Sequence, residues 1–191
     1  MLGFLLALCA TLLARPADIP TILLEIRVFE GAEEVTRSTR ITVYRAGDRV
    51  EPIVQLGPAA ARLEADVTAG IYDVQAIHED EGRVLNIRWA ERLVVMPYPD
   101  EAGRHLEVLN LKSGFGALQV RGKGLSSPPV VAVYHAGSRG KEAATRIVGR
   151  DYALFVLPAG KYDVQTRATD RSMWYAGIDV PPDRTRLWLL P

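Results

Sequence analysis

The chain has 191 residues, with 23 basic and 23 acidic side chains, 48% hydrophobic residues and one cysteine. This composition fits one large or two small folded domains, and it excludes a disordered or collagen-like chain. A formal net charge of zero argues against a nucleic-acid partner. A single cysteine excludes an intramolecular disulfide and a cysteine-rich zinc site.

The first fourteen residues carry no charge and are apolar from Leu2 to Leu13. A run of this length matches the core of a secretory signal peptide and is too short to span a bilayer. We predict that residues 1–14 are a signal peptide cleaved after Ala14, which removes Cys9. No basic residue precedes the run, which departs from the usual signal. The mature chain is expected to have no transmembrane span and to reach the periplasm or the cell surface.

Two segments of the chain recur ninety positions later. The motif ITVYRAGDR at 41–49 returns as VAVYHAGSR at 131–139, and AGIYDVQA at 69–76 returns as AGKYDVQT at 159–166. No gap falls between the two matches, and eleven of the thirty-six aligned positions are identical. Self-similarity at a fixed offset is the signature of a duplicated structural unit.

The duplication predicts two domains of similar fold. We expect the first to span residues 21–111 and the second 115–191, with 112–114 as the linker. Segments in both are short, rich in Val, Leu, Ile and Tyr, and interrupted by Gly, Pro or Asp. The alternation in ARLEADV at 61–67 is that of a half-buried antiparallel strand. With six or seven strands per copy and no helical periodicity, the predicted fold class is all-β, two tandem immunoglobulin-like β-sandwiches.

The segment LPAGKYDVQTR at 157–167 resembles the penultimate strand of prealbumin-like sandwiches. Carboxypeptidase regulatory-like, Cna-B-type and PEGA-type repeats share this pattern, and the resemblance covers mainly the turn and strand of each copy. It implies tandem prealbumin-like domains that act as noncatalytic appendages or binding modules. The catalytic exception, the transthyretin-type hydrolases, ends in a Tyr-Arg-Gly-Ser tail, whereas this chain ends LWLLP.

Four residues of these segments are predicted to be structural turn anchors: Gly70 and Tyr72 in the first copy, Gly160 and Tyr162 in the second. The resemblance implies that proline and glycine make the turn, as Pro158 and Gly160 do in the second copy, and that the tyrosine packs under it. Glycine adopts positive φ without steric cost. Tyrosine buries its ring while its hydroxyl bonds to backbone.

No catalytic or metal-ligating constellation stands out in the sequence. His78, His105 and His135 are the only histidines, and nothing in their spacing indicates that they meet. The acidic run HEDEG at 78–82 is expected to be a solvated hairpin tip. Calcium binding there is the open alternative, although the spacing is not that of a dedicated calcium loop. We expect no cofactor.

Two matched pairs of residues bear on binding. Asp73 and Asp163 are expected to face outward, either as a repeated contact patch or as ordinary sheet solvation. Trp89 corresponds to Trp174, and both are natural candidates for sugar stacking. Alternation along the chain nevertheless places both tryptophans in the core and Tyr175 on the opposite, exposed face.

One strand face differs between the two copies. The outward residues of the strand at 61–67 are all charged, whereas their counterparts ninety positions later are Tyr152, Leu154 and Val156. Three neighbouring apolar side chains on one exposed face form a hydrophobic patch, which favours association. We predict a possible interface there, covered by the other domain, a second copy or a partner. Coverage by the second domain's own loops is the alternative.

Charge is also divided unequally along the chain. Residues 1–115 hold 12 basic and 17 acidic side chains, a net charge of −5, and residues 116–191 hold 11 and 6, a net charge of +5. Opposite charges favour docking of the two domains or head-to-tail association, both weakened by salt. Drift after duplication is the alternative.

The function expected from these features is that of a noncatalytic, exported tandem β-sandwich protein that binds or scaffolds in the cell envelope. Its partner is expected to be an unidentified envelope protein or a second copy of the chain. A carbohydrate-binding accessory protein is the alternative. A transthyretin-type small-molecule hydrolase is a third hypothesis, which the missing tail and the scattered histidines disfavour.

Overall fold

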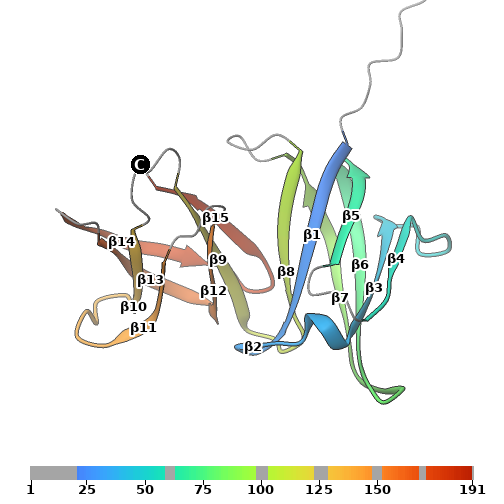
Figure 1. The fold of residues 1–191 in the computed structure, drawn as a ribbon, viewed down its shortest axis with the longest axis horizontal. Helices are drawn as coiled ribbons and strands as arrows, with labels where there is room; N and C mark the ends of the chain where they lie inside the picture. The colour runs from blue at the N-terminus through green and yellow to red at the C-terminus, as the bar shows by residue number, and fades with distance from the viewer. Residues whose placement is uncertain are drawn as a thin grey trace, which may run out of the picture.

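The structure is a computed structural model, and it describes residues 21–58, 63–97, 103–122, 129–147, 152–167 and 171–190. Within these ranges the chain is almost entirely β-strand, and four sheets pair into two sandwiches (Figure 1). The predicted signal peptide at 1–14 lies outside the described residues, and so does Arg62. In the described ranges we find no helix long and apolar enough to cross a membrane. The all-β prediction is confirmed.

Sandwich 1 contains the strands β1 to β8. Its inner sheet, named for facing the other sandwich, consists of β1 (Thr21–Glu30), β2 (Glu33–Glu34), β5 (Leu63–Thr68) and β8 (Arg104–Asn110). Its outer sheet has the order β4 (Val54–Leu56), β3 (Thr39–Arg45), β6 (Gly70–Asp80) and β7 (Arg83–Val95). A short 3-10 helix, Thr36–Ser38, precedes β3. Neighbouring strands are antiparallel except for β1 and β8, which are parallel.

Sandwich 2 contains the strands β9 to β15. Its inner sheet has the order β12 (Ala153–Pro158), β9 (Phe115–Arg121) and β15 (Thr185–Leu189). Its outer sheet has the order β11 (Glu142–Ile147), β10 (Val130–His135), β13 (Gly160–Arg167) and β14 (Ser172–Val180). The first and last strands, β9 and β15, pair in parallel, as β1 and β8 do.

The two sandwiches agree in register as well as in strand order. Leu24 of β1 lies opposite Ala65 of β5, and Leu118 of β9 lies opposite Phe155 of β12, ninety positions after Ala65. The bulge in the outer sheet recurs too, since the pairing of β6 with β7 shifts after Tyr72 and that of β13 with β14 after Tyr162. Residues can therefore be compared between the sandwiches position by position.

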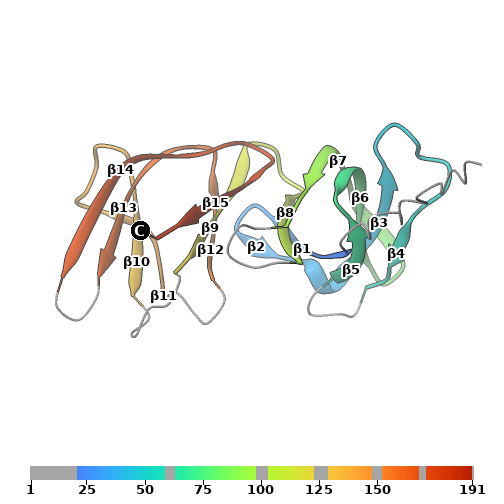
Figure 2. The same ribbon diagram turned by 90° about the horizontal axis from the view of Figure 1, so that it is seen from above.

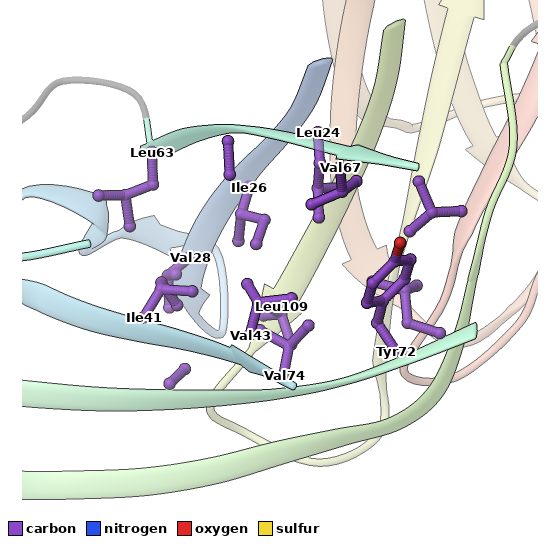
Figure 3. Close-up of a cluster of buried hydrophobic side chains, with 14 of the residues drawn as sticks. Leu24, Ile26, Val28, Ile41, Val43, Leu63, Val67, Tyr72, Val74 and Leu109 are labelled. Atoms are coloured by element: carbon purple, nitrogen blue, oxygen red, sulfur yellow. The ribbon is translucent and has the colours of Figure 1, made fainter. Parts of the chain in front are cut away.

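Each sandwich has its own hydrophobic core between its two sheets. In sandwich 1, alternate residues of β1 face inward against Val43, Val74 and Tyr72, as Figure 3 shows. Along β5 the inward side chains are buried, whereas Glu64 and Asp66 are exposed, so the predicted half-buried strand is confirmed. β-Branched and aromatic side chains fill such pleated, one-sided surfaces well.

The four sheets lie in a row, with the two inner sheets facing each other between the two outer sheets (Figures 1 and 2). Side chains from both inner sheets touch across this junction. The chain is therefore a stack of sheets in which three layers of side chains are enclosed, one within each sandwich and one between them.

Candidate functional site: the sandwich contact and the tryptophan faces

The contact between the sandwiches has an apolar centre. Phe29 and Val108 of sandwich 1 are buried together with Ala117 of sandwich 2, and Leu154 and Val156 pack against them. Phe29 is 8% exposed and Val108 4% exposed. The structure thus places two of the three predicted interface residues against the other sandwich, where their counterparts in sandwich 1 are Glu64 and Asp66.

Tyr152, the third predicted interface residue, reaches across the same junction. Its hydroxyl donates a hydrogen bond to Oε1 of Glu25 at 3.0 Å, and Glu25 is only 3% exposed. Burial and the nearby Glu25 carboxylate raise the pKa of Tyr152. The guanidinium of Arg121 lies 5.9 Å from the ring centroid of Tyr152. Polar groups buried at this contact therefore find partners across it.

A second polar contact ties the edge strand β8 to β15. Oε1 of Glu107 accepts hydrogen bonds from the amide and the hydroxyl of Thr185, at 3.0 and 2.9 Å. The Thr185 hydroxyl in turn accepts from the amide of Val108 at 2.8 Å. Arg88 pairs with Asp183 at 2.5 Å on the same side. These bonds depend on the relative position of the two sandwiches and therefore restrain it.

The link between the sandwiches begins at a fixed point. Asn110 is 4% exposed, and its Oδ1 accepts from the amides of Gly31 and Lys112, each at 3.0 Å. Its Nδ2 donates to the carbonyl of Gly31 at 2.7 Å. The side chain thus bonds the start of the link to the turn between β1 and β2, which limits the freedom of the joint.

Two grooves flank the contact. One, of about 600 Å³, lies between the β1–β2 turn and β11 and β12, and its lining includes Phe29, Leu154 and Arg146. The other, of about 720 Å³, is lined by residues of β7, β8 and the β14–β15 turn, Trp89 and Asp183 among them. Grooves between domains are common places for ligands.

The four predicted turn anchors occupy matching places in the two sandwiches. Tyr72 and Tyr162 are each 1% exposed, and their hydroxyls donate to the carbonyls of Thr68 and Pro158, both at 2.6 Å. Gly70 lies over the Tyr72 ring, where an added Cβ would come within 3.4 Å of it. The corresponding distance at Gly160 is 3.9 Å. Burial raises the pKa of Tyr162.

Asp73 is the centre of a cluster that we call the Asp–Arg–Trp clasp of sandwich 1. Its Oδ1 accepts from the amide of Arg92 at 2.9 Å, and its Oδ2 accepts from Nε of Arg49 at 2.9 Å and from the amide of Gly47 at 3.4 Å. The guanidinium of Arg49 lies 4.2 Å from the ring centroid of Trp89. Asp73 is 3% exposed, so the expectation that it faces solvent is wrong.

Sandwich 2 repeats the clasp around Asp163. Its carboxylate accepts from the amide of Gly177 at 3.1 Å, from Nε of Arg139 at 3.0 Å and from the amide of Gly137 at 3.5 Å. The guanidinium of Arg139 lies 4.5 Å from the ring centroid of Trp174. Asp163 is 4% exposed, so the expectation that it faces solvent is wrong here too. The sequence signal for this cluster was the identity of its glycine, arginine and aspartate in the two copies: Gly47, Arg49 and Asp73 match Gly137, Arg139 and Asp163.

The clasp explains why both aspartates are buried although they lie on the outer face of the sheet, at the bulge. The amides that they bind belong to Arg92 and Gly177, which have positive φ of 53° and 68° at the bulged positions of β7 and β14. A bulge leaves backbone groups without a ladder partner. The aspartate supplies that partner, and the arginine offsets the charge that is buried with it.

These bonds keep both carboxylates ionised. The Arg92 amide is the largest cause that lowers the pKa of Asp73, and the Arg139 guanidinium is the largest that lowers the pKa of Asp163. A carboxyl with a lowered folded-state pKa stabilises the fold above its unfolded pKa of about 3.9. This contribution is lost as the pH falls from there through the lower folded-state pKa.

We therefore expect the free energy of unfolding to decrease as the pH falls below about 4, because the two aspartates must then be protonated. Urea denaturation at a series of pH values measures this slope. The double variant Asp73→Asn, Asp163→Asn is expected to be less stable at neutral pH and to show a shallower decrease in acid. An unchanged slope in the double variant would show that other groups cause the acid sensitivity.

The tryptophans do not lie where alternation predicts. Trp174 is 37% exposed, and Trp89 is half-buried on the outer face of its sheet, beside Tyr44 at 5.7 Å between ring centroids. The bulge inserts one residue and reverses the alternation after it, so Ala90 and Leu93 both pack against the core of sandwich 1. The prediction of two core tryptophans is therefore wrong.

Tyr175 is also misplaced by alternation. It is half-buried, and its ring meets that of Trp188 edge-on at 4.9 Å between centroids. Trp188 itself packs against the core of sandwich 2. The expectation that Tyr175 is exposed is wrong for the same reason. The bulge at Gly177 reverses the alternation along β14, so residues before it and after it cannot be assigned to a face by one period of two.

The three histidines have separate surroundings. His78 is 8% exposed and its Nδ1 lies 3.7 Å from a carboxylate oxygen of Glu30. His105 contacts the carbonyl of Met96 at 2.9 Å, and the ring of His135 lies 5.2 Å from that of Tyr162. Within the described part of the chain, which includes 78–82, no group of three metal-ligating side chains is placed to hold an ion.

Comparisons with known proteins give structural likeness only. No protein-family model and no curated protein matches the sequence. Among solved structures, the TIE protein of Bacillus anthracis is 14% identical with a TM-score of 0.33, over 90% of this chain and 34% of that chain, so this chain spans about a third of its length. A tip fimbrial protein from Porphyromonas gingivalis is 8% identical with a TM-score of 0.36, over 90% of this chain and 96% of that chain.

Proposed function

We propose that this chain is an exported, noncatalytic binding or scaffolding protein of the cell envelope, built from two prealbumin-like sandwiches. The observation that carries the proposal is the contact of the two inner sheets. Its apolar centre, its crossing hydrogen bonds and the fixed start of the link at Asn110 join two domains of opposite net charge into one unit. Such a unit holds two outer sheets at a constant spacing.

The chemistry of the buried charges supports a structural role for them. Asp73 and Asp163 each bind two backbone amides and an arginine, and Glu107 binds Thr185 across the sandwich contact. A general acid or nucleophile needs a group that is free to exchange protons or attack a substrate. These carboxylates are instead used to hold bulges and to join the sandwiches.

The proposal is tested with the chain expressed in its source organism. We expect it in the periplasmic or surface fraction, cross-linked to a discrete partner that mass spectrometry identifies. The Leu154→Glu variant is expected to lose that partner because separated sandwiches no longer hold their outer sheets at one spacing. Recovery of the chain in the cytoplasm, or only in uncross-linked form, would contradict the proposal.

Carbohydrate binding is the second candidate, and the exposure of Trp174 favours it. Against a simple stacking site, the ring already has Arg139 over its face and Tyr134 at 5.0 Å between ring centroids. Retention on insoluble cell-wall polysaccharide measures this activity. Binding that is lost in Trp174→Ala but kept in Met173→Ala would assign the protein to this class.

A further inference from the structure

A groove opens at the end of sandwich 1 where the β6–β7 hairpin projects past the 3-10 helix and β2 (Figure 1). Its volume is about 570 Å³, and its lining comes from β1, β2, the 3-10 helix, β6 and β7. A volume of this size suits a ligand larger than a single ion. We call it the end groove.

The end groove is acidic. Its lining holds four carboxylates and two guanidiniums: those of Glu30, Glu33, Glu34, Asp80, Arg27 and Arg37. Arg27 binds Glu34 through two hydrogen bonds, so these two charges cancel. Glu33 and Asp80 are exposed, and neither forms an ion pair with a residue that the structure describes. Arg37 offsets one of the three remaining carboxylates, so the groove attracts a cation.

A buried histidine in the same groove lacks a hydrogen-bond partner. His78 of β6 is 8% exposed, and its Nδ1 forms no hydrogen bond with any described residue. Oε2 of Glu30 is 3.7 Å away, which is too far for a hydrogen bond. A buried polar atom without a partner costs free energy. A donor that binds Glu30 from the groove lies beside this nitrogen and can supply the missing bond.

The end groove also presents apolar surface next to its carboxylates. Leu85, the extra residue at a bulge of β7, is 53% exposed and lines the groove together with the half-buried Val35. Val84 and Ile87 flank Leu85 along the strand and are 48% and 52% exposed. Carboxylates beside apolar groups match a lysine or arginine side chain, because its aliphatic stem packs on apolar groups while its charged end binds the acid.

The acidic hairpin is specific to sandwich 1. Gln75 lies opposite Trp89, fourteen positions later, whereas Gln165 lies opposite Trp174, nine positions later. Where sandwich 1 has HEDEG at 78–82, the matching segment of sandwich 2 at 168–172 is ATDRS, with one acid. The clasps and the turn anchors recur in both sandwiches. The fold therefore does not require the longer, acidic hairpin.

The geometry favours a basic side chain over a metal ion or a free amine. In the described ranges no three ligating side chains converge, and a metal ion needs convergent ligands. An ammonium or guanidinium instead bonds separate acceptors through its several N–H groups. A free amine would leave Val84, Leu85 and Ile87 exposed to water, whereas a peptide segment with apolar residues covers them.

We propose that the end groove binds a segment of a partner protein in which a lysine or arginine lies between apolar residues. The basic group bonds Glu30, Glu33 and Asp80, and the apolar neighbours pack on Leu85. The net charge of −5 over residues 1–115 favours the approach of such a segment. The inference names the chemistry of a partner and so rests on the proposed binding function.

Isothermal titration calorimetry of the full chain tests the proposal, with the blocked peptide Leu-Lys-Leu-Lys-Leu as the probe. Two matched peptides separate its features: Leu-Glu-Leu-Glu-Leu reverses the charge, and Ser-Lys-Ser-Lys-Ser removes the apolar groups. We expect saturable binding of the first peptide at one site per chain and no binding of the second. The third is expected to bind about tenfold more weakly because it buries no apolar side chain.

A double variant locates the binding in the end groove. Asp80→Asn with Leu85→Ser removes one carboxylate and one apolar side chain, both exposed, so the variant is expected to fold, which circular dichroism checks. Its affinity for the first peptide is expected to fall about tenfold. The control, Glu51→Gln with Val50→Ser, makes the same two chemical changes at exposed residues of the β3–β4 loop and is expected to bind as wild type does.

The proposal is overturned if the first peptide shows no saturable binding, if the glutamate peptide binds equally well, or if the groove variant binds as the control does. Putrescine that binds as tightly as the peptide would assign the groove to a free amine instead. A chain that captures an envelope partner by cross-linking but does not bind the peptide keeps the proposed function and loses only this inference.

Discussion

Tyr162→Ala is expected to destabilise sandwich 2 by about 3 to 5 kcal/mol, as expected for the loss of a large ring from a packed core. The Tyr162 side chain is 1% exposed and packs with Phe155 and Val164. Its removal leaves a cavity beneath the turn that Pro158 and Gly160 form. Urea denaturation, followed by the midpoint and slope of each transition, measures the change.

The conservative variant Tyr162→Phe separates the ring from the hydroxyl. It removes only the hydrogen bond to the carbonyl of Pro158, an exposed residue whose carbonyl regains water, so we expect a loss of about 1 kcal/mol. Tyr72→Ala is the matched change in sandwich 1 and is expected to have a similar effect there. A loss below about 1 kcal/mol for Tyr162→Ala would mean that the ring does not anchor the turn.

Leu154→Glu is expected to separate the two sandwiches while leaving each folded. The leucine packs against the apolar cluster that includes Phe29 and Val108, and the substitution puts a carboxylate in place of this contact. Loss of the apolar contact alone removes roughly 1.5 to 3 kcal/mol of docking free energy. We expect a larger radius of gyration in small-angle X-ray scattering and two calorimetric transitions in place of a coupled one.

The chain itself provides the reason to expect folding of the Leu154→Glu variant. Glu64 occupies the matching position of β5. It lies opposite Glu25 of β1, as Leu154 of β12 lies opposite Gln119 of β9. A strand of this fold therefore accepts glutamate at this position. Met173→Glu, on an exposed residue of the outer sheet, is the control and is expected to leave the scattering profile unchanged. An unchanged radius for Leu154→Glu would show that Leu154 does not hold the sandwiches together.

The strands could be predicted because their determinants are local. The period of two in LEADV places Leu63, Ala65 and Val67 on one face, and the structure buries them. The repeated AGxYDVQ segments likewise allowed the strand topology of one sandwich to be expected in the other. Alternation failed only where the backbone departs from regular pairing, at the bulges before Leu93 and Ile178. A bulge inserts one residue, so every assignment across it changes face.

The clasps show a different limit of local reasoning. The identities of Gly47, Arg49 and Asp73 with their partners ninety positions later were visible, but their meaning was not. The aspartate reaches a backbone amide on the next strand and an arginine on a loop, and no spacing along the chain shows that these meet. Once these groups meet, the arginine pairs with the aspartate, and this pairing allows the carboxylate to be buried. The same guanidinium then stacks on the tryptophan ring.

The sequence alone determined the all-β class, the repeated segments and the difference between the charged and apolar versions of one strand face, because these depend on residue type and period. Only the tertiary structure decided that the inner sheets face each other and that Asp73 and Asp163 are buried. Those outcomes depend on which surfaces meet across long stretches of chain. The hydrophobic effect is not directional, so the geometry of the fold, and not residue type, determines which apolar surfaces come into contact.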